Sequence, residues 1–293
     1  FSGGVIKIKD FEPMWADMAT DFQLDGPDVH LTRIDLVTDG TRSRLQGDVD
    51  LANFPEMTYR LESDIDFTRM REIFFADENF SASGEGKFDG TFHKFEGGFD
   101  LQGTFTSEVA GINAFRFEEL DGQLLWQRDR FQVWEVAARP YGGQAWWDFT
   151  MEPLGGLLPA QATFEFRYQD VQVGQLLQAL ELPGFRPIAK ASGRNFLEWN
   201  LGEFADFRNE GSIRFDPPEG VRLATDQLPA HLPSEVQDRA RRPPDLTTRD
   251  FQIGGELEYT ADGDWIELAS GRIATPSTSI TFYGRTSWGV DSR

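Results

Sequence analysis

The chain of 293 residues contains no cysteine, which excludes disulfide bonds and thiolate chemistry. It also lacks any run of about 18 apolar residues, the length that a membrane-spanning helix needs. Basic residues are few: 28 Lys and Arg stand against 49 Asp and Glu, which gives a formal net charge of −21. Nucleic acids and anionic headgroups bind basic surfaces, so this balance argues against both as partners. The acidic balance is compatible with apolar ligands, with cationic partners and with a role in solubility alone.

Signatures of catalysis are absent as well. The sequence has no Gly-x-Ser-x-Gly elbow and no Gly-x-x-x-x-Gly-Lys phosphate loop. None of the three histidines has a metal-ligand spacing: His30, His93 and His231. Two acidic pairs, Asp48/Asp50 and Asp64/Asp66, each place two carboxylates on one strand face, opposite the apolar residues. We interpret them as solvated charges. We therefore expect no enzyme activity, no cofactor and no metal site.

What the sequence does contain is a strong alternation of apolar and polar residues. From Tyr59 to Phe67 every second residue is apolar or small, and Phe95 to Phe105 repeats the pattern with glycines among the phenylalanines. A two-residue period is typical of an antiparallel sheet with one apolar and one wet face. Turn residues separate the expected strands, at Asp39-Gly40, Asp121-Gly122, Gly142-Gly143, Gly155-Gly156 and Asp262-Gly263. The sequence therefore predicts a mostly β fold.

A strand-turn-strand unit recurs along the chain. Leu36 to Leu51 is followed about 100 residues later by the similar Val136 to Met151, and a third copy covers Ile273 to Trp288. Repeats of this kind form arrays whose neighbours bury one continuous apolar face. Because the spacing is long, each unit should hold several strands. We divide the chain into a first β unit, a second β unit, a Pro-rich connection and the start of a third unit, at 1–110, 111–216, 217–250 and 251–293.

Two short segments have helical spacing instead. Phe67 to Phe75 and Val171 to Leu182 place apolar residues three and four positions apart. Each follows a strand that ends in an aspartate, Asp66 or Asp170, which we expect to cap the start of the helix. A third short helix is expected from Ser234 to Arg241, within the Pro-rich connection.

In this order, the elements resemble the AsmA-like proteins, the superfamily that includes TamB. The three strand-turn-strand units match the family's pattern, and Asp170 to Leu182 is similar to its short helix. Gly84 to Gly103 is similar to the Gly-punctuated strands that follow that helix. The similarity covers most of the chain except the Pro-rich connection. The resemblance implies a repetitive, long antiparallel sheet curled into a taco-like open trough, with two or three short helices.

The members of this family run across the periplasm of double-membraned bacteria and are thought to pass lipids between membranes or to assist outer-membrane assembly. The resemblance therefore implies an apolar groove for phospholipid acyl chains, with an outer-membrane β-barrel protein as a further partner. The chain starts at Phe1, without Met or a secretory signal, and the family's inner-membrane anchor is absent. We expect an internal, periplasmic fragment of a longer, anchored envelope protein.

Aromatic side chains are expected to line this groove. They are Phe88, Phe92, Phe99, Phe105, Trp126, Trp147, Phe149, Phe164 and Phe166. The same residues would equally fill the closed core of a β-sandwich. That alternative predicts a non-catalytic binding or spacer module for a glycan or protein ligand, with Trp134 or Trp146 as a surface platform. Because Trp146 and Trp147 are adjacent, they should point to opposite faces of one strand, and one of them should be exposed or covered by a neighbouring element.

Overall fold

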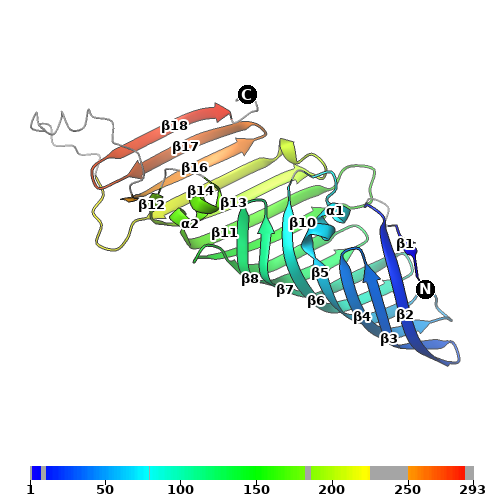
Figure 1. Ribbon diagram of the computed structural model, residues 1–293. Helices are drawn as coiled ribbons and strands as arrows, with labels where there is room; N and C mark the ends of the chain where they lie inside the picture. The colour runs from blue at the N-terminus through cyan, green and yellow to red at the C-terminus, as the bar shows by residue number, and fades with distance from the viewer. Residues whose placement is uncertain (1, 8–10, 79, 182–185, 225–249, 288–293) are drawn as a thin grey trace, which may run out of the picture. The chain divides into compact units, whose positions relative to one another are not determined.

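The computed structural model describes residues 2–7, 11–78, 80–181, 186–224 and 250–287, and the helix expected at 234–241 lies outside them (Figure 1). The chain divides into two compact units. Unit 1 comprises Phe1–Pro140, Ala145–Phe166 and Phe196–Arg208, and unit 2 comprises Tyr141–Gln144, Arg167–Asn195 and Asn209–Arg293. This division crosses the repeat boundaries expected from the sequence, because some long strands contribute one end to each unit. The repeat units at 1–110 and 111–216 stay predictions.

The fold is mostly β, as predicted, and its main element is one antiparallel 16-stranded sheet. The strands follow one another in nearly sequential order: β1 (Gly4–Ile6), β2 (Met14–Asp25), β3 (Asp28–Thr38), β4 (Thr41–Asp50), β5 (Met57–Asp66), β6 (Ala82–Phe95), β7 (Gly98–Ile112), β8 (Phe115–Gln127), β9 (Phe131–Arg139), β10 (Gln144–Glu152), β11 (Gln161–Gln172), β13 (Lys190–Asn200), β14 (Arg208–Asp216), β16 (Gly254–Asp262), β17 (Trp265–Ala274) and β18 (Ser279–Ser287). The order begins at β1 and ends at β18, so the sheet is open, as expected. A second, two-stranded parallel sheet joins β12 (Arg186–Ile188) to β15 (Asp250–Gln252).

The three strand-turn-strand units are antiparallel hairpins, formed by β3–β4, β9–β10 and β17–β18. Neighbouring strands pair in register around each turn, with Ile273 opposite Ile280 in the last hairpin. Successive side chains of a strand point to opposite faces of the sheet. The alternation of apolar and polar residues therefore places every second side chain of each strand on the buried face.

One predicted turn is wrong, because Asp121-Gly122 lies inside β8. Gly122 pairs with Phe105 of β7, and a Cβ atom at this glycine would meet the Phe105 ring at 2.7 Å. In the same way, a Cβ atom at Gly103 would meet the Phe88 ring at 2.8 Å. Glycines inside these strands therefore make room for aromatic rings that lie flat over the sheet.

Among the described residues two α-helices interrupt the strands, and their starts differ. At α1 (Phe67–Phe74) the predicted cap is confirmed, since the Asp66 carboxylate accepts hydrogen bonds from the backbone N–H groups of Thr68 and Arg69 at 2.9 and 3.2 Å. At α2 (Val173–Ala179) it is wrong. The cap residue is Gln172, whose side chain makes no capping hydrogen bond to the helix backbone. Asp170 belongs to β11, where its carboxylate pairs with Lys190 of β13 at 3.5 Å.

Neither of these helices, nor the short 3-10 helix η1 (Phe204–Asp206), is long and apolar enough to cross a membrane, and the same holds for every helix among the described residues.

Each unit has its own hydrophobic core. In unit 1 the buried residues are Ala110, Phe117, Leu120, Val136 and Ala138, and Phe67 of α1 packs against them. In unit 2 they are Val173, Ala189, Ala191 and Ile253, so α2 contributes its first residue directly. Burial raises the pKa of the Tyr168 hydroxyl, which borders the second core, well above its usual range. In both units a short helix therefore packs on the apolar side of the sheet.

Candidate apolar binding face

The aromatic residues predicted to line a groove all lie in unit 1 and share one face of its sheet. Directly paired residues on neighbouring strands point to the same side. Four such pairs continue this face from β6 to β10: Phe88 with Phe105, Leu101 with Trp126, Trp126 with Phe131, and Val136 with Trp147. Ring contacts extend it to β11, where Phe166 lies 5.9 Å from Trp147 and 5.7 Å from Phe164. We call this surface the aromatic face.

Ring contacts connect much of the aromatic face into one continuous row that runs from β5 to η1. Neighbouring ring centroids are 5.1 to 6.4 Å apart, in the order Tyr59, Phe92, Phe99, Trp126, Phe131, Phe149, Trp199 and Phe204. Such edge and offset geometries are the favourable ones for aromatic pairs. All of these side chains are half-buried, so each keeps some apolar surface within reach of solvent.

Four members of this row were not predicted from the sequence. Tyr59 has a usable signal, because it stands in phase with the alternation of β5. Phe131 and Trp199 lie at strand ends, where a period of two residues is too short to recognise, and Phe204 belongs to the 3-10 turn. Their place on the face depends on the pairing of distant strands, which the sequence does not reveal.

The predicted lining residues contribute unequally. Phe88 is only 5 % exposed, because its ring covers Gly90 and Gly103. Phe105 is half-buried over Gly122, and Trp147 packs on the core of unit 1. Phe88 therefore acts mainly in sheet packing, whereas the remaining rings present more accessible surface.

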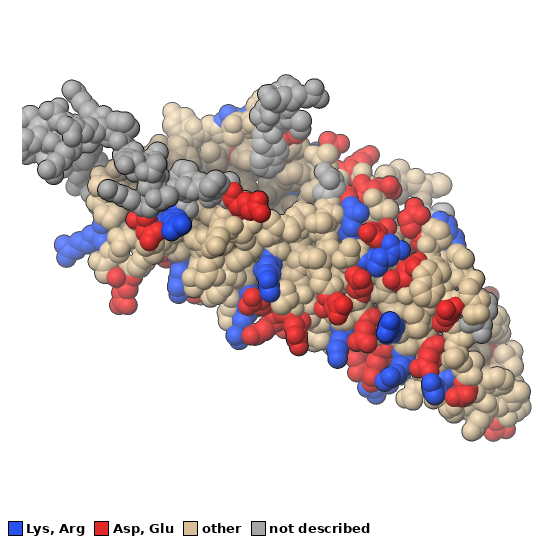
Figure 2. All heavy atoms as spheres, viewed as in Figure 1, with Lys and Arg blue, Asp and Glu red and all other residues tan. Residues whose placement is uncertain are grey.

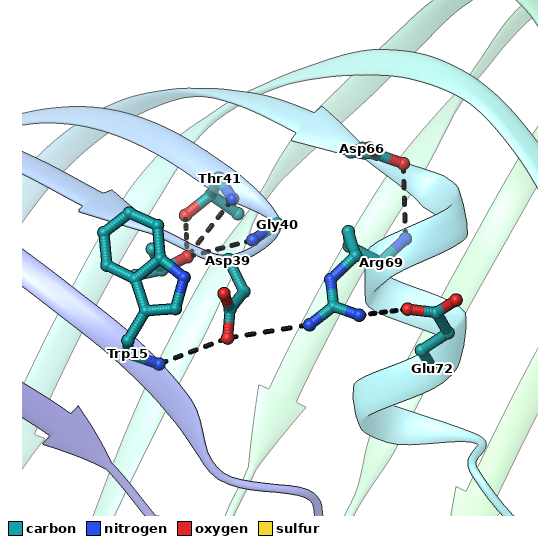
Figure 3. Close-up of polar contacts among 8 residues, drawn as sticks. Trp15, Asp39, Gly40, Thr41, Asp66, Arg69 and Glu72 are labelled. Carbon is teal, nitrogen blue, oxygen red and sulfur yellow. Dashed lines mark hydrogen bonds and ion pairs between the residues drawn. The ribbon is translucent and has the colours of Figure 1, made fainter.

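A short helix covers part of the aromatic face. Phe74 of α1 meets the Trp126 ring edge-on at 5.3 Å, and Phe11, which precedes β2, lies 6.0 Å from the same ring. Just after the helix, Phe75 lies 6.4 Å from Phe149. Figure 1 and Figure 3 show α1 inside the curve of the unit 1 sheet, with strands of the same sheet passing behind it. The trough of unit 1 is therefore open along the sheet but occupied by α1 near Trp126.

The opposite face of the sheet is charged. Figure 2 shows acidic side chains, with basic ones among them, over the outer surface of β2 to β5. A hollow of about 440 Å³ on β3 to β5 is lined by Arg33, Arg44 and Arg60 together with Asp35 and Glu62. Arg44 lies directly opposite Asp35 of β3 and Glu62 of β5 in the strand register, so charges of both signs alternate within this hollow. The outer face is thus polar, and acidic groups predominate over the chain as a whole.

The acidic pairs noted in the sequence lie on this outer face as surface charges. Asp48 forms a 2.5 Å hydrogen bond with His30, which raises the pKa of that imidazole above its ordinary value. Asp50 holds the following turn through Asn53, and this hydrogen bond lowers the pKa of its carboxyl. Among the described residues, no group of three His, Cys, Asp or Glu side chains is placed to hold a metal ion.

The outer face also carries scattered exposed aromatics. Trp146 is 40 % exposed, whereas its neighbour Trp147 is half-buried on the aromatic face. Of the two alternatives expected for the outer ring, exposure is the one that the structure has. Phe196 of β13 alternates with the inward-pointing Asn195 and Leu197 and is 42 % exposed. Single exposed rings of this kind are common on protein surfaces and need no ligand to explain them.

The site is therefore apolar, extended and without a convergent set of polar or titratable groups in the described chain. No protein-family model, no curated protein and no solved structure matches this sequence.

Proposed function

We propose that the aromatic face of unit 1 holds phospholipid acyl chains, and that the protein is a segment of a conduit that passes lipids between the two membranes of a bacterial envelope. The observation that carries this proposal is one open sheet with a continuous row of half-buried rings on a single side. A closed sandwich would instead need a second sheet of comparable size, and the only other sheet among the described residues has two strands.

The aromatic face is suited to bind a hydrocarbon chain weakly at many positions, so that the chain can move along it, and not tightly at one fixed position. Burial of apolar surface is favourable by about 25 cal/mol per Å² and has no preferred direction. A row of rings such as Phe99, Trp126 and Phe131 offers similar contacts at each step, so no step holds the chain strongly. The charged outer face keeps such a sheet soluble and discourages association between its edges.

The setting of this activity follows from the resemblance to AsmA-like proteins and belongs to the proposal. We place the segment in the periplasm, within a longer protein anchored in the inner membrane. Help with outer-membrane assembly, through contact with an outer-membrane β-barrel protein, would use the same apolar surface.

The test is phospholipid capture by a variant with one charge on the aromatic face. Phe99 contacts both Phe92 and Trp126, and its partner across the strands is Lys94, so an aspartate at position 99 gains a cationic neighbour and the sheet should still form. Phe99→Asp should lower the capture of a fluorescent phospholipid at least about threefold, because a carboxylate resists burial against hydrocarbon.

The matched control is Phe196→Asp, which makes the same chemical change on the outer face of unit 1. It should leave capture at the wild-type level. Equal losses in the two variants, or no phospholipid bound to the purified wild-type protein, would contradict the proposal. Retardation by soluble polysaccharide without lipid capture would favour the glycan-binding alternative, in which exposed Trp146 is the platform.

A further inference from the structure

The helix α1 and the residues that follow it occupy the place on the aromatic face where a hydrocarbon would lie. Phe74 contacts Trp126, and Phe75 contacts Phe149, so two consecutive residues pack against two rings of the continuous row. At the other end of the helix, the Phe67 ring lies over Gly86 of β6. The segment from 67 to 78 therefore makes apolar contacts of the same kind that an acyl chain would make.

Polar contacts hold the first half of this segment to the β3–β4 turn. Arg69 pairs with Asp39 of that turn at 3.6 Å and also with Glu72 of its own helix. Figure 3 shows Asp39 between Arg69 and the backbone N–H of Trp15, which donates a 3.2 Å hydrogen bond to the same carboxylate. The Arg69 and Asp39 side chains are partly exposed, so this attachment is modest and reversible.

A single buried carboxylate holds the other end. Glu78 is 3 % exposed, and its Oε1 atom accepts hydrogen bonds from the indole N–H of Trp199 at 3.2 Å and from the backbone N–H of Gly202 at 2.9 Å. Its Oε2 atom is buried and has no hydrogen-bond partner among the residues that the structure describes. A buried charge with one unsatisfied oxygen is costly, and exposure to water would relieve that cost. The Glu78 carboxylate therefore makes geometrically specific hydrogen bonds, but water can readily replace them.

From these contacts we infer that the segment 67–78 is a built-in occupant of the aromatic face, which must leave Trp126 and Phe149 when a hydrocarbon ligand binds there. This inference rests on the proposed function, because it names how that same face is regulated. The helix-covered and helix-free forms of the aromatic face are in equilibrium. A ligand that binds only the helix-free form shifts this equilibrium by its full binding free energy for that form. The ligand must then offset the free energy of displacing the helix. The attachments at Arg69 and Glu78 contribute to that free energy, together with the buried Ile73 side chain and the hydrogen bond from the Glu12 backbone N–H to the Ile73 carbonyl.

A reversible covalent lock tests the displacement directly. A Cβ atom at Gly40 would lie 3.1 Å from the Cβ of Arg69, close to the separation of about 3.5–4.5 Å found in disulfides. The only closer atom is the terminal methyl of Met70, which can rotate away, and the chain has no cysteine of its own. The double variant Gly40→Cys/Arg69→Cys should therefore form one defined disulfide between the β3–β4 turn and α1.

We expect the oxidised double variant to capture at least about fivefold less fluorescent phospholipid from phosphatidylethanolamine/phosphatidylglycerol vesicles than the same protein after reduction. The disulfide keeps the first turn of α1 on the β3–β4 turn, so the helix can leave as a unit only after reduction. The single variants Gly40→Cys and Arg69→Cys, which cannot form the lock, should capture equally under both conditions. Equal capture by the oxidised and reduced double variant would overturn the inference and leave the proposed function intact. Absence of capture by wild-type protein would overturn both.

The second attachment gives an independent prediction of opposite sign. Glu78→Ala removes the acceptor of two charge-assisted hydrogen bonds, so amide hydrogen exchange in α1 should accelerate about tenfold. Phospholipid capture should rise at the same time. Glu108→Ala, which removes an exposed carboxylate from the outer face of β7, is the control and should change neither quantity. Unchanged exchange and capture in Glu78→Ala would refute the role of Glu78 as an attachment.

Discussion

Replacement of Val136 by aspartate is expected to abolish the folding of unit 1. Val136 lies in the middle of β9 with 0 % exposure, and its neighbours are the apolar core residues Phe117, Leu120 and Ala138. A carboxylate at this position would lose its hydration and would find no cation in the described core. The cost of an unpaired buried charge is about 4 kcal/mol or more, which is a large share of the stability of most domains.

Urea denaturation followed by tryptophan fluorescence measures this effect. The control is Val5→Asp, which makes the same change in β1 at a side chain that is 70 % exposed. We expect the control to unfold within about 0.5 kcal/mol of wild type, as exposed substitutions usually do. A folded Val136→Asp protein with near wild-type stability would mean that the interior of unit 1 admits water.

The second large effect is expected at Gly103 of β7. A Cβ atom there would meet the backbone oxygen of Asp89 at 2.2 Å, the Cα of Gly90 at 2.6 Å and the Phe88 ring at 2.8 Å. The two backbone atoms belong to the neighbouring strand and cannot rotate away. Gly103→Val should therefore destabilise unit 1 by at least about 3 kcal/mol, because overpacking forces a shift of the sheet itself.

Differential scanning calorimetry should register this change as a fall in melting temperature of roughly 6–12 °C, given about 2–4 °C per kcal/mol for a unit of this size. Gly156→Val is the control: a Cβ atom there has no neighbour closer than 3.8 Å, and its melting temperature should match wild type. If both variants melt together with wild type, the close approach of β6 and β7 at Gly103 does not hold in solution.

Local patterns predicted the architecture well, because the two-residue alternation of a strand can be recognised within a few consecutive residues. The alternation from Tyr59 to Phe67 gives both β5 and the first residue of α1, and the cap at Asp66 is confirmed. The repeated hairpins at Leu36 and Val136 are likewise local in sequence. Wherever the determining contacts lie within about ten residues, the sequence is sufficient to predict them.

Predictions that depend on distant pairing were less successful. Asp121-Gly122 has the composition of a turn, yet the requirement for space under the Phe105 ring of another strand places Gly122 inside β8. Asp170 has the composition of a helix cap, but Lys190 on the adjacent strand holds its carboxylate. The occupation of the aromatic face by Phe74 could not be foreseen at all, because it joins a helix to a strand about 50 residues away.

The Phe105 ring fills the space that a side chain at position 122 would need, and this limits which substitutions the chain can accept during evolution. The nearest atoms to a Cβ at Gly122 all belong to side chains, of Phe105 and Val136, and not to the backbone. A larger residue at 122 thus becomes tolerable once position 105 or 136 becomes smaller. Substitutions at these positions should therefore occur together during evolution: a larger residue at 122 should accompany a smaller one at 105 or 136.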